Sequence, residues 1–94
     1  MDKEEELKIE EQFIEATKNS DYSDFDKLYN QYKEKDLKNI LIDCFVLVCS
    51  KTRDEDFAKH IVHIGENSIL CYIFDNDKNI FKYFKIAICT ACFN

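Results

Sequence analysis

The 94-residue sequence contains no proline, no tryptophan and a single glycine. Folds rich in β-hairpins need residues with positive or preset φ at their tight turns, so this composition favours helices. No apolar run is long enough to cross a bilayer, and the N-terminal segment lacks the apolar core of a secretory signal. We therefore expect a helical protein without a membrane-spanning segment.

The chain also lacks an excess of positive charge. Its net charge is −6, and residues 1–36 hold twelve acidic side chains against six lysines, whereas residues 37–94 hold seven acids and seven bases. Such a chain repels phosphate backbones, so direct nucleic-acid binding is not expected. An acidic face can dock a basic protein, imitate DNA, or serve solubility alone.

Hydrophobic residues make up 46% of the chain, which is enough for one packed domain spanning residues 1–94. The five cysteines are an odd number, and Cys44, Cys49 and Cys89 lie within apolar helical runs, where cysteine acts as a small hydrophobe. We expect a reducing compartment, the cytoplasm or the nucleus. A composition rich in Asn, Lys and Ile but poor in Gly suggests an AT-rich genome, and hence a viral or pathogen protein acting in a host.

Periodicity predicts the first helices. The first spans residues 4–19, and the second begins at Ser23, with Asp26 in capping-box spacing. The third, capped by Asp36, spans residues 37–50 and is apolar on nearly every side, which predicts a central helix enclosed by its neighbours. A second capping box, Thr52 to Glu55, opens a fourth helix that ends at Gly65 in a left-handed conformation.

The remainder of the chain predicts one more helix. Residues 69–74 fit a strand or a short buried helix equally well, residues 75–79 form a loop, and an apolar helix begins at Ile80. Its several apolar faces suggest self-association through this C-terminal helix. The predicted fold is all-α, with about five helices in antiparallel hairpins around the central helix.

An internal similarity appears when the chain is shifted by 32 residues. Phe13 then matches Phe45, and Phe25 matches Phe57, each pair at the same place in a helical hairpin. Residues 56–65, "DFAKHIVHIG", resemble the second helix of an ankyrin repeat, and residues 24–29 follow the same pattern. The resemblance covers mainly residues 13–66, and the Thr-Pro-Leu-His turn of that family is absent. It implies a stack of helical hairpins that recognises proteins, with no catalytic residues.

Two histidine and cysteine pairs raise the question of a metal site. His60 and His63 lie three residues apart on one helix, and Cys89 and Cys92 lie three apart on another, so together they could bind tetrahedral zinc. Structural zinc sites usually place one pair on a tight knuckle, which both pairs here lack. The alternative is core cysteines plus surface histidines, and we therefore expect no metal and no other cofactor.

No pattern indicates catalysis. A single glycine excludes a glycine-rich phosphate loop, and no nucleophile, base and orienting acid occur in a recognisable arrangement. The sequence therefore predicts a non-enzymatic protein.

The second predicted helix carries tyrosines among acidic residues, which suggests a surface that recognises a partner. Tyrosine is frequent at the energetic centres of protein interfaces, although half-buried helix tyrosines are also common. The candidate partner-binding residues are Asp21, Tyr22, Asp24, Asp26, Tyr29 and Tyr32. We expect a protein-interaction or inhibitor module with a basic protein partner. One alternative is a DNA-mimicking inhibitor acting through residues 2–26, including Glu10, Glu11, Glu15 and Asp21; another is a small zinc-dependent regulator.

Overall fold

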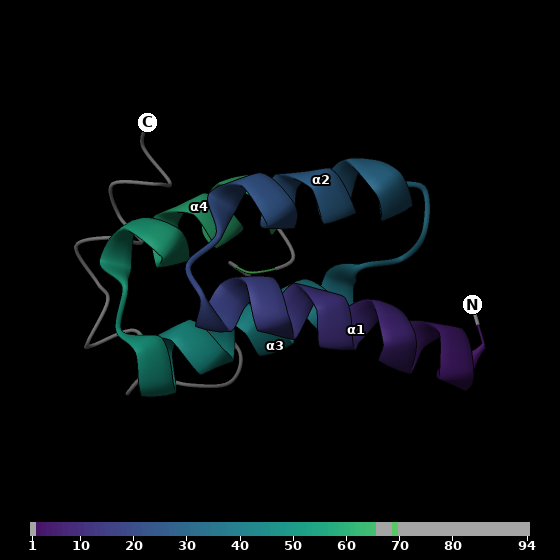
Figure 1. Cartoon of the computed structure of the whole chain (residues 1–94), viewed down its shortest axis with the longest axis horizontal. Helices are drawn as coiled ribbons and strands as arrows, with labels where there is room; N and C mark the ends of the chain where they lie inside the picture. The colour runs from purple at the N-terminus through teal and green to yellow at the C-terminus, as the bar shows by residue number, and fades with distance from the viewer. Residues whose placement is uncertain (1, 66–68, 70–94) are drawn as a thin grey trace.

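The computed structural model describes residues 2–65 and residue 69 of the chain. Over these residues it contains no strand, but four α-helices and a π-helical turn: α1 (Lys3–Lys18), α2 (Tyr22–Tyr32), α3 (Lys38–Leu47), η1 (Val48–Thr52) and α4 (Glu55–Gly65) (Figure 1). The predicted all-α fold is confirmed. The helix predicted from Ile80, most of the ambiguous segment 69–74, and self-association through the C-terminal helix lie outside the described residues.

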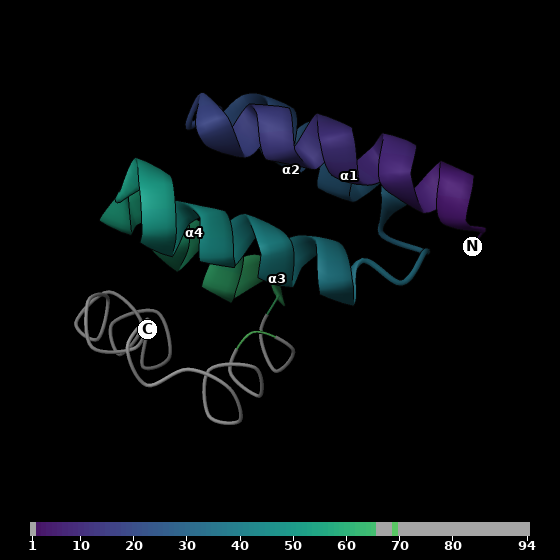
Figure 2. The same cartoon turned by 90° about the horizontal axis from the view of Figure 1, so that it is seen from below.

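The helices form two hairpins, one above the other. α1 and α2 make the first hairpin, while α3, η1 and α4 make the second, and Figure 2 shows the first pair lying over the second. α1 packs against both α2 and α3, and α3 packs against α4. As a result α1 and α3 occupy one row, and α2 and α4 occupy the other (Figure 1).

A serine in the left-handed conformation closes the first hairpin. The φ angle of Ser20 is 50°. The amide of Ser20 donates to the carbonyl of Thr17 (3.1 Å), and the amide of Asp21 donates to that of Ala16 (2.9 Å). This pair of bonds is the Schellman motif, which satisfies the last carbonyls of a helix and turns the chain sharply. The turn directs α2 back along α1.

An aspartate caps the second helix of each hairpin, α2 and α4, and in neither helix is it the residue that we predicted. The Asp21 carboxylate accepts from the amide of Asp24 (3.0 Å), so Asp21 caps α2 and the predicted cap at Ser23 is wrong. The Asp54 carboxylate accepts from the amide of Phe57 (3.1 Å), so Asp54 takes the role that we assigned to Thr52. Both aspartates directly follow a left-handed residue, Ser20 or Arg53. The reversal of the chain therefore decides which polar residue reaches the open amides.

The third helix changes its geometry before it ends. We predicted one α-helix over residues 37–50, but the α-helical part stops at Leu47 and a π-helical turn continues to Thr52. The predicted cap at Asp36 is wrong, because the N-cap residue is Leu37; the Asp36 carboxylate accepts from the amide of Lys38 (3.2 Å). At the other end, the amide of Arg53 donates to the carbonyl of Val48 (2.7 Å), which closes the wider π-helical turn.

The apolar stripe of this helix is buried as predicted. Its members are Leu37, Ile40, Leu41, Cys44, Phe45, Val48 and Cys49. On the other side Ile42, Val46 and Leu47 are only half-buried, and Asp43 is exposed. The prediction of a helix enclosed on every side was too strong, because α1 and α4 cover only part of its circumference.

α4 is described up to Gly65, and the predicted left-handed conformation of this glycine is wrong. No glycine among the described residues has a positive φ. A Cβ atom on Gly65 would instead lie 2.5 Å from Cγ1 of Ile69, which is fully buried. The missing side chain thus permits a close approach rather than a left-handed turn.

Three phenylalanines join the two hairpins. The ring of Phe25 lies 5.2 Å from that of Phe13 and 5.3 Å from that of Phe57, both edge-to-face. All three side chains are completely buried. Edge-to-face pairs contribute about 0.5–1.5 kcal/mol beyond the burial of their area. Phe25 therefore links α1 to α4 through the centre of the molecule.

Candidate functional site

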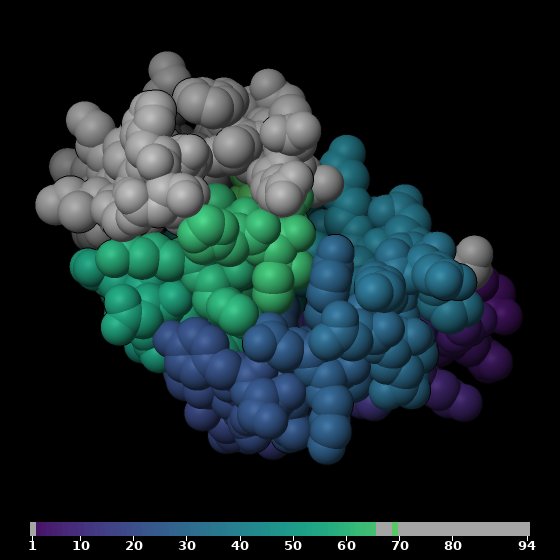
Figure 3. Space-filling model, turned by 90° about the horizontal axis from the view of Figure 1, so that it is seen from above, coloured from purple at the N-terminus to yellow at the C-terminus, as the bar shows by residue number. Residues whose placement is uncertain are grey.

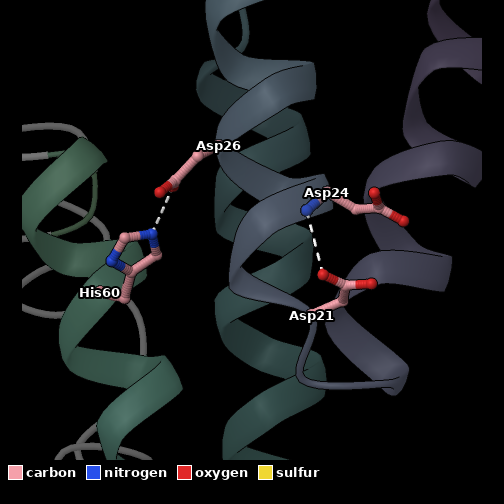
Figure 4. Close-up of polar contacts among 4 residues, drawn as sticks. All are labelled: Asp21, Asp24, Asp26 and His60. Carbon is pink, nitrogen blue, oxygen red and sulfur yellow. Dashed lines mark hydrogen bonds and ion pairs between the residues drawn. The ribbon is translucent and has the colours of Figure 1, made fainter.

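The predicted partner-binding residues of α2 separate onto different sides of the helix. Figure 4 shows that the Asp26 side chain points toward α4, whereas the Asp24 side chain points toward α1. Asp21 uses its carboxylate as the α2 cap. Tyr29 and Tyr32 are half-buried and pack against the core. The structure therefore divides this set among several places instead of gathering it into one surface.

Asp26 and Tyr22 belong to the seam between α2 and α4. An Asp26 carboxylate oxygen lies 2.5 Å from Nε2 of His60. The Tyr22 ring lies 5.1 Å from the His60 ring and 5.0 Å from that of Phe57. Atoms of the two helices adjoin along this side in the space-filling view (Figure 3). These side chains hold the hairpins together.

Tyr22 still keeps part of its ring in solvent, since the residue is 39% exposed. Its pKa is raised above the ordinary value, first by burial and then by the negative charges of Asp54 and Asp56. The phenol therefore stays protonated at neutral pH. Tyr22 is the member of the predicted set that combines exposure with aromatic packing.

The residues considered for zinc do not converge within the described residues. His60 is engaged with Asp26, and His63 is exposed on α4. Cys89 and Cys92 lie outside the described part of the chain. Among residues 2–65 and 69, no three metal-binding side chains cluster together.

Cys44 is a core residue beneath α1. Burial raises the pKa of its thiol to about 12, although a hydrogen bond with Thr17 acts in the opposite direction. A thiol that stays protonated at neutral pH is a poor nucleophile. The contact with Thr17 therefore serves packing between α1 and α3.

Two carboxyl groups meet on the α1–α3 side. A side-chain hydrogen bond with Asp43, followed by burial and the charges of Asp43 and Glu6, raises the pKa of Glu10 to about 7. Near neutrality a large share of Glu10 is protonated, so that it donates to the Asp43 carboxylate. This part of the acidic face is thus occupied by a contact within the protein.

Several of the predicted acidic residues line a groove between α1 and α2. Its volume is about 660 Å³, and we call it the α1–α2 groove. Ala16 and Leu28 form its apolar part, while Glu11, Glu15 and Asp24 bring three carboxylates. The full set of lining residues is Lys8, Glu11, Gln12, Glu15, Ala16, Asn19, Asp24 and Leu28.

The groove is open and its acids are accessible. Glu11, Glu15 and Asp24 are all exposed. The Asn19 amide lies 3.4 Å from a Glu15 carboxylate oxygen, and the Gln12 amide donates to the carbonyl of Lys8. These local bonds order the polar side chains along α1.

Sequence reasoning found only part of this groove. Asp24 was among the candidate binding residues, and Glu11 and Glu15 were in the proposed DNA-mimicking set. Lys8, Gln12 and Asn19 were overlooked, although with Glu15 they recur at intervals of three or four residues along one side of the first helix. That interval marks a polar helix face. Leu28, which α2 contributes to the groove, appeared in the sequence to be an ordinary member of the apolar stripe.

Comparison with known proteins found no matching family model, no similar curated protein and no similar solved structure. None of the helices described here is both long and apolar enough to span a bilayer.

Proposed function

We propose that this protein is a non-enzymatic protein-interaction module that binds a basic partner through the α1–α2 groove. One observation carries the proposal: three exposed carboxylates, Glu11, Glu15 and Asp24, line a groove of about 660 Å³ together with the apolar side chains of Ala16 and Leu28. Recognition sites commonly combine apolar area, which supplies affinity, with charges that select the partner. The acidic balance of the chain favours the approach of basic proteins.

A relation to helical repeats of the ankyrin type is part of this proposal, and the described helices form two hairpins, one above the other. Positions 32 residues apart are buried in both hairpins, as Phe13 and Phe45 illustrate. Both hairpins also turn through a left-handed residue followed by a capping aspartate. Stacked hairpins of this kind expose extended surfaces that suit protein binding. A cytoplasmic location, within a host cell if the protein is viral, is part of this proposal.

The alternative function, a DNA-mimicking inhibitor, uses some of the same carboxylates. Glu11 and Glu15 are exposed and accessible to a DNA-binding protein. By contrast, Glu10 faces Asp43 and Asp21 caps α2, so charge reversal at these two residues would disturb the fold. A fair test of either function therefore leaves Glu10 and Asp21 unchanged.

The test compares two variants with equal charge loss. The groove variant carries E11Q, E15Q and D24N, and the control variant carries E34Q, E55Q and D56N, all at exposed positions. Asp24 lies in the first turn of α2, and Glu55 and Asp56 lie in that of α4, so the control variant loses at least as much helix-dipole interaction as the groove variant. Circular dichroism and thermal melting first establish that both variants fold.

The proteins captured by the tagged wild type from an extract are then quantified by mass spectrometry. We expect a basic protein that the control variant captures and the groove variant loses. Release of that protein by duplex DNA would favour the DNA-mimicking alternative. Equal capture by both variants would refute the groove as the binding surface.

A further inference from the structure

The α1–α2 groove has a counterpart in the second hairpin. Adding 32 to each of its residue numbers gives eight positions on α3, η1 and α4. These are Ile40, Asp43, Cys44, Leu47, Val48, Lys51, Asp56 and His60.

Several of these counterpart positions contact the first hairpin. The Cys44 side chain lies against Thr17 of α1. His60 pairs with Asp26 of α2 and packs against Tyr22 (Figure 4). The second hairpin therefore docks onto the first through the face that corresponds to the groove. On this scaffold, that face of a hairpin is shaped to pack against helices.

The chemistry of the two faces differs in a specific way. Ile40 and Val48 are buried, and their counterparts in the groove are Lys8 and Ala16. The groove has Glu15 at the position where the second hairpin has Leu47, and it has Leu28 where the second hairpin has His60. The groove thus keeps a small apolar floor that permits the close approach of a helix, and it surrounds this floor with an excess of negative charge.

We propose that the α1–α2 groove docks an amphipathic helix of a partner protein, in which lysine or arginine side chains flank a narrow apolar stripe. The stripe lies on Ala16 and Leu28, and the basic side chains pair with Glu11, Glu15 and Asp24. Charge complementarity selects this occupant, since three carboxylates against one lysine disfavour an acidic or purely apolar helix. This inference rests on the proposed function and specifies the form of its partner.

The experiment uses the full chain and three synthetic peptides, each labelled with a fluorophore. The first is an 18-residue helix-forming peptide with a Leu/Ala stripe flanked by lysines. The second replaces the lysines with glutamates, and the third scrambles the first so that its composition is kept and its stripe is lost. Fluorescence anisotropy gives the affinities, and amide chemical shifts of isotope-labelled protein locate the binding site.

We expect the striped lysine peptide to bind, with shifts concentrated on α1 and α2 around Ala16 and Leu28. The groove variant should bind it at least about ten-fold more weakly, while the control variant should change by less than about two-fold, because only the groove charges pair with the peptide. The glutamate peptide should not bind detectably.

Three results would overturn the inference. If the groove variant and the control variant bound the striped lysine peptide equally weakly, the attraction would be unspecific and due to charge alone. Chemical-shift changes elsewhere on the protein would place the binding site outside the groove. Equal binding of the scrambled peptide would exclude helical recognition. In the last case, groove-dependent capture of a basic protein would still support the proposed function, so the two failures are distinguishable.

Discussion

Replacing Glu10 with glutamine tests the carboxyl pair between α1 and α3. The folded protein holds the pKa of Glu10 at about 7, against 4.5 for an ordinary glutamate, mainly because protonated Glu10 hydrogen-bonds with Asp43. Folding therefore favours the protonated form. The resulting stabilisation is complete below pH 4.5 and is lost as the pH rises through 7.

The size of the effect follows from the same values. A pKa change from 4.5 to about 7 corresponds to at most roughly 3 kcal/mol. Because Glu10 is partly exposed, screening by solvent reduces this to about 1 kcal/mol. The side-chain amide introduced by E10Q can donate to Asp43 at every pH, so the variant keeps the contact that the wild type loses.

Urea unfolding of wild type and E10Q, followed by circular dichroism from about pH 4.5 to 8.5, provides the measurement. We expect similar stability near pH 4.5 and a variant more stable by about 1 kcal/mol near pH 8. E34Q, at an exposed position on the loop after α2, is the control and should show no such pH-dependent difference. A pH-independent difference between E10Q and wild type would refute the shared proton.

Other predictions address the packing and the turns. Phe25→Ala should cost about 3–5 kcal/mol in urea unfolding, since it empties the centre of the aromatic cluster; a loss below about 1.5 kcal/mol would contradict that role. Ser20→Gly should raise stability by about 0.5–1 kcal/mol because it relieves a left-handed serine, whereas Ser23→Gly, inside α2, should lower it. Asp54→Ala should cost about 1 kcal/mol through the lost cap. Thr52→Val should cost less, since the buried Thr52 hydroxyl has no hydrogen-bond partner within the described part of the chain. A larger loss of stability for Thr52→Val than for Asp54→Ala would indicate that Thr52 caps α4.

Local patterns were sufficient to identify the four described helices. The stripe of Phe25 and Leu28 predicted α2, and the run of apolar residues from Leu37 predicted α3, because helical periodicity is written into the order of residues. The residues that cap the helices were harder to predict. Asp21 and Ser23 both suit a helix start, and the choice between them depends on the direction in which Ser20 turns the chain.

The candidate site was harder to predict than the helices. Asp24 and Asp26 lie two residues apart and looked equivalent in the sequence, but one lines the α1–α2 groove and the other pairs with His60 of α4. Glu10 and Glu11 are neighbours, yet Glu10 faces Asp43 while Glu11 lines the groove. Each assignment depends on which helix lies opposite, and that neighbour is distant in sequence.

The sequence by itself determined the all-α class, the helical segments and the acidic balance of the first third of the chain, because propensity, periodicity and charge are properties of neighbouring residues. Only the tertiary structure decided which acidic residues remain exposed around a groove and which are consumed by contacts between helices. The physical reason is that two hairpins pack together through some helix faces and leave others open, and a helix pattern does not reveal its partner.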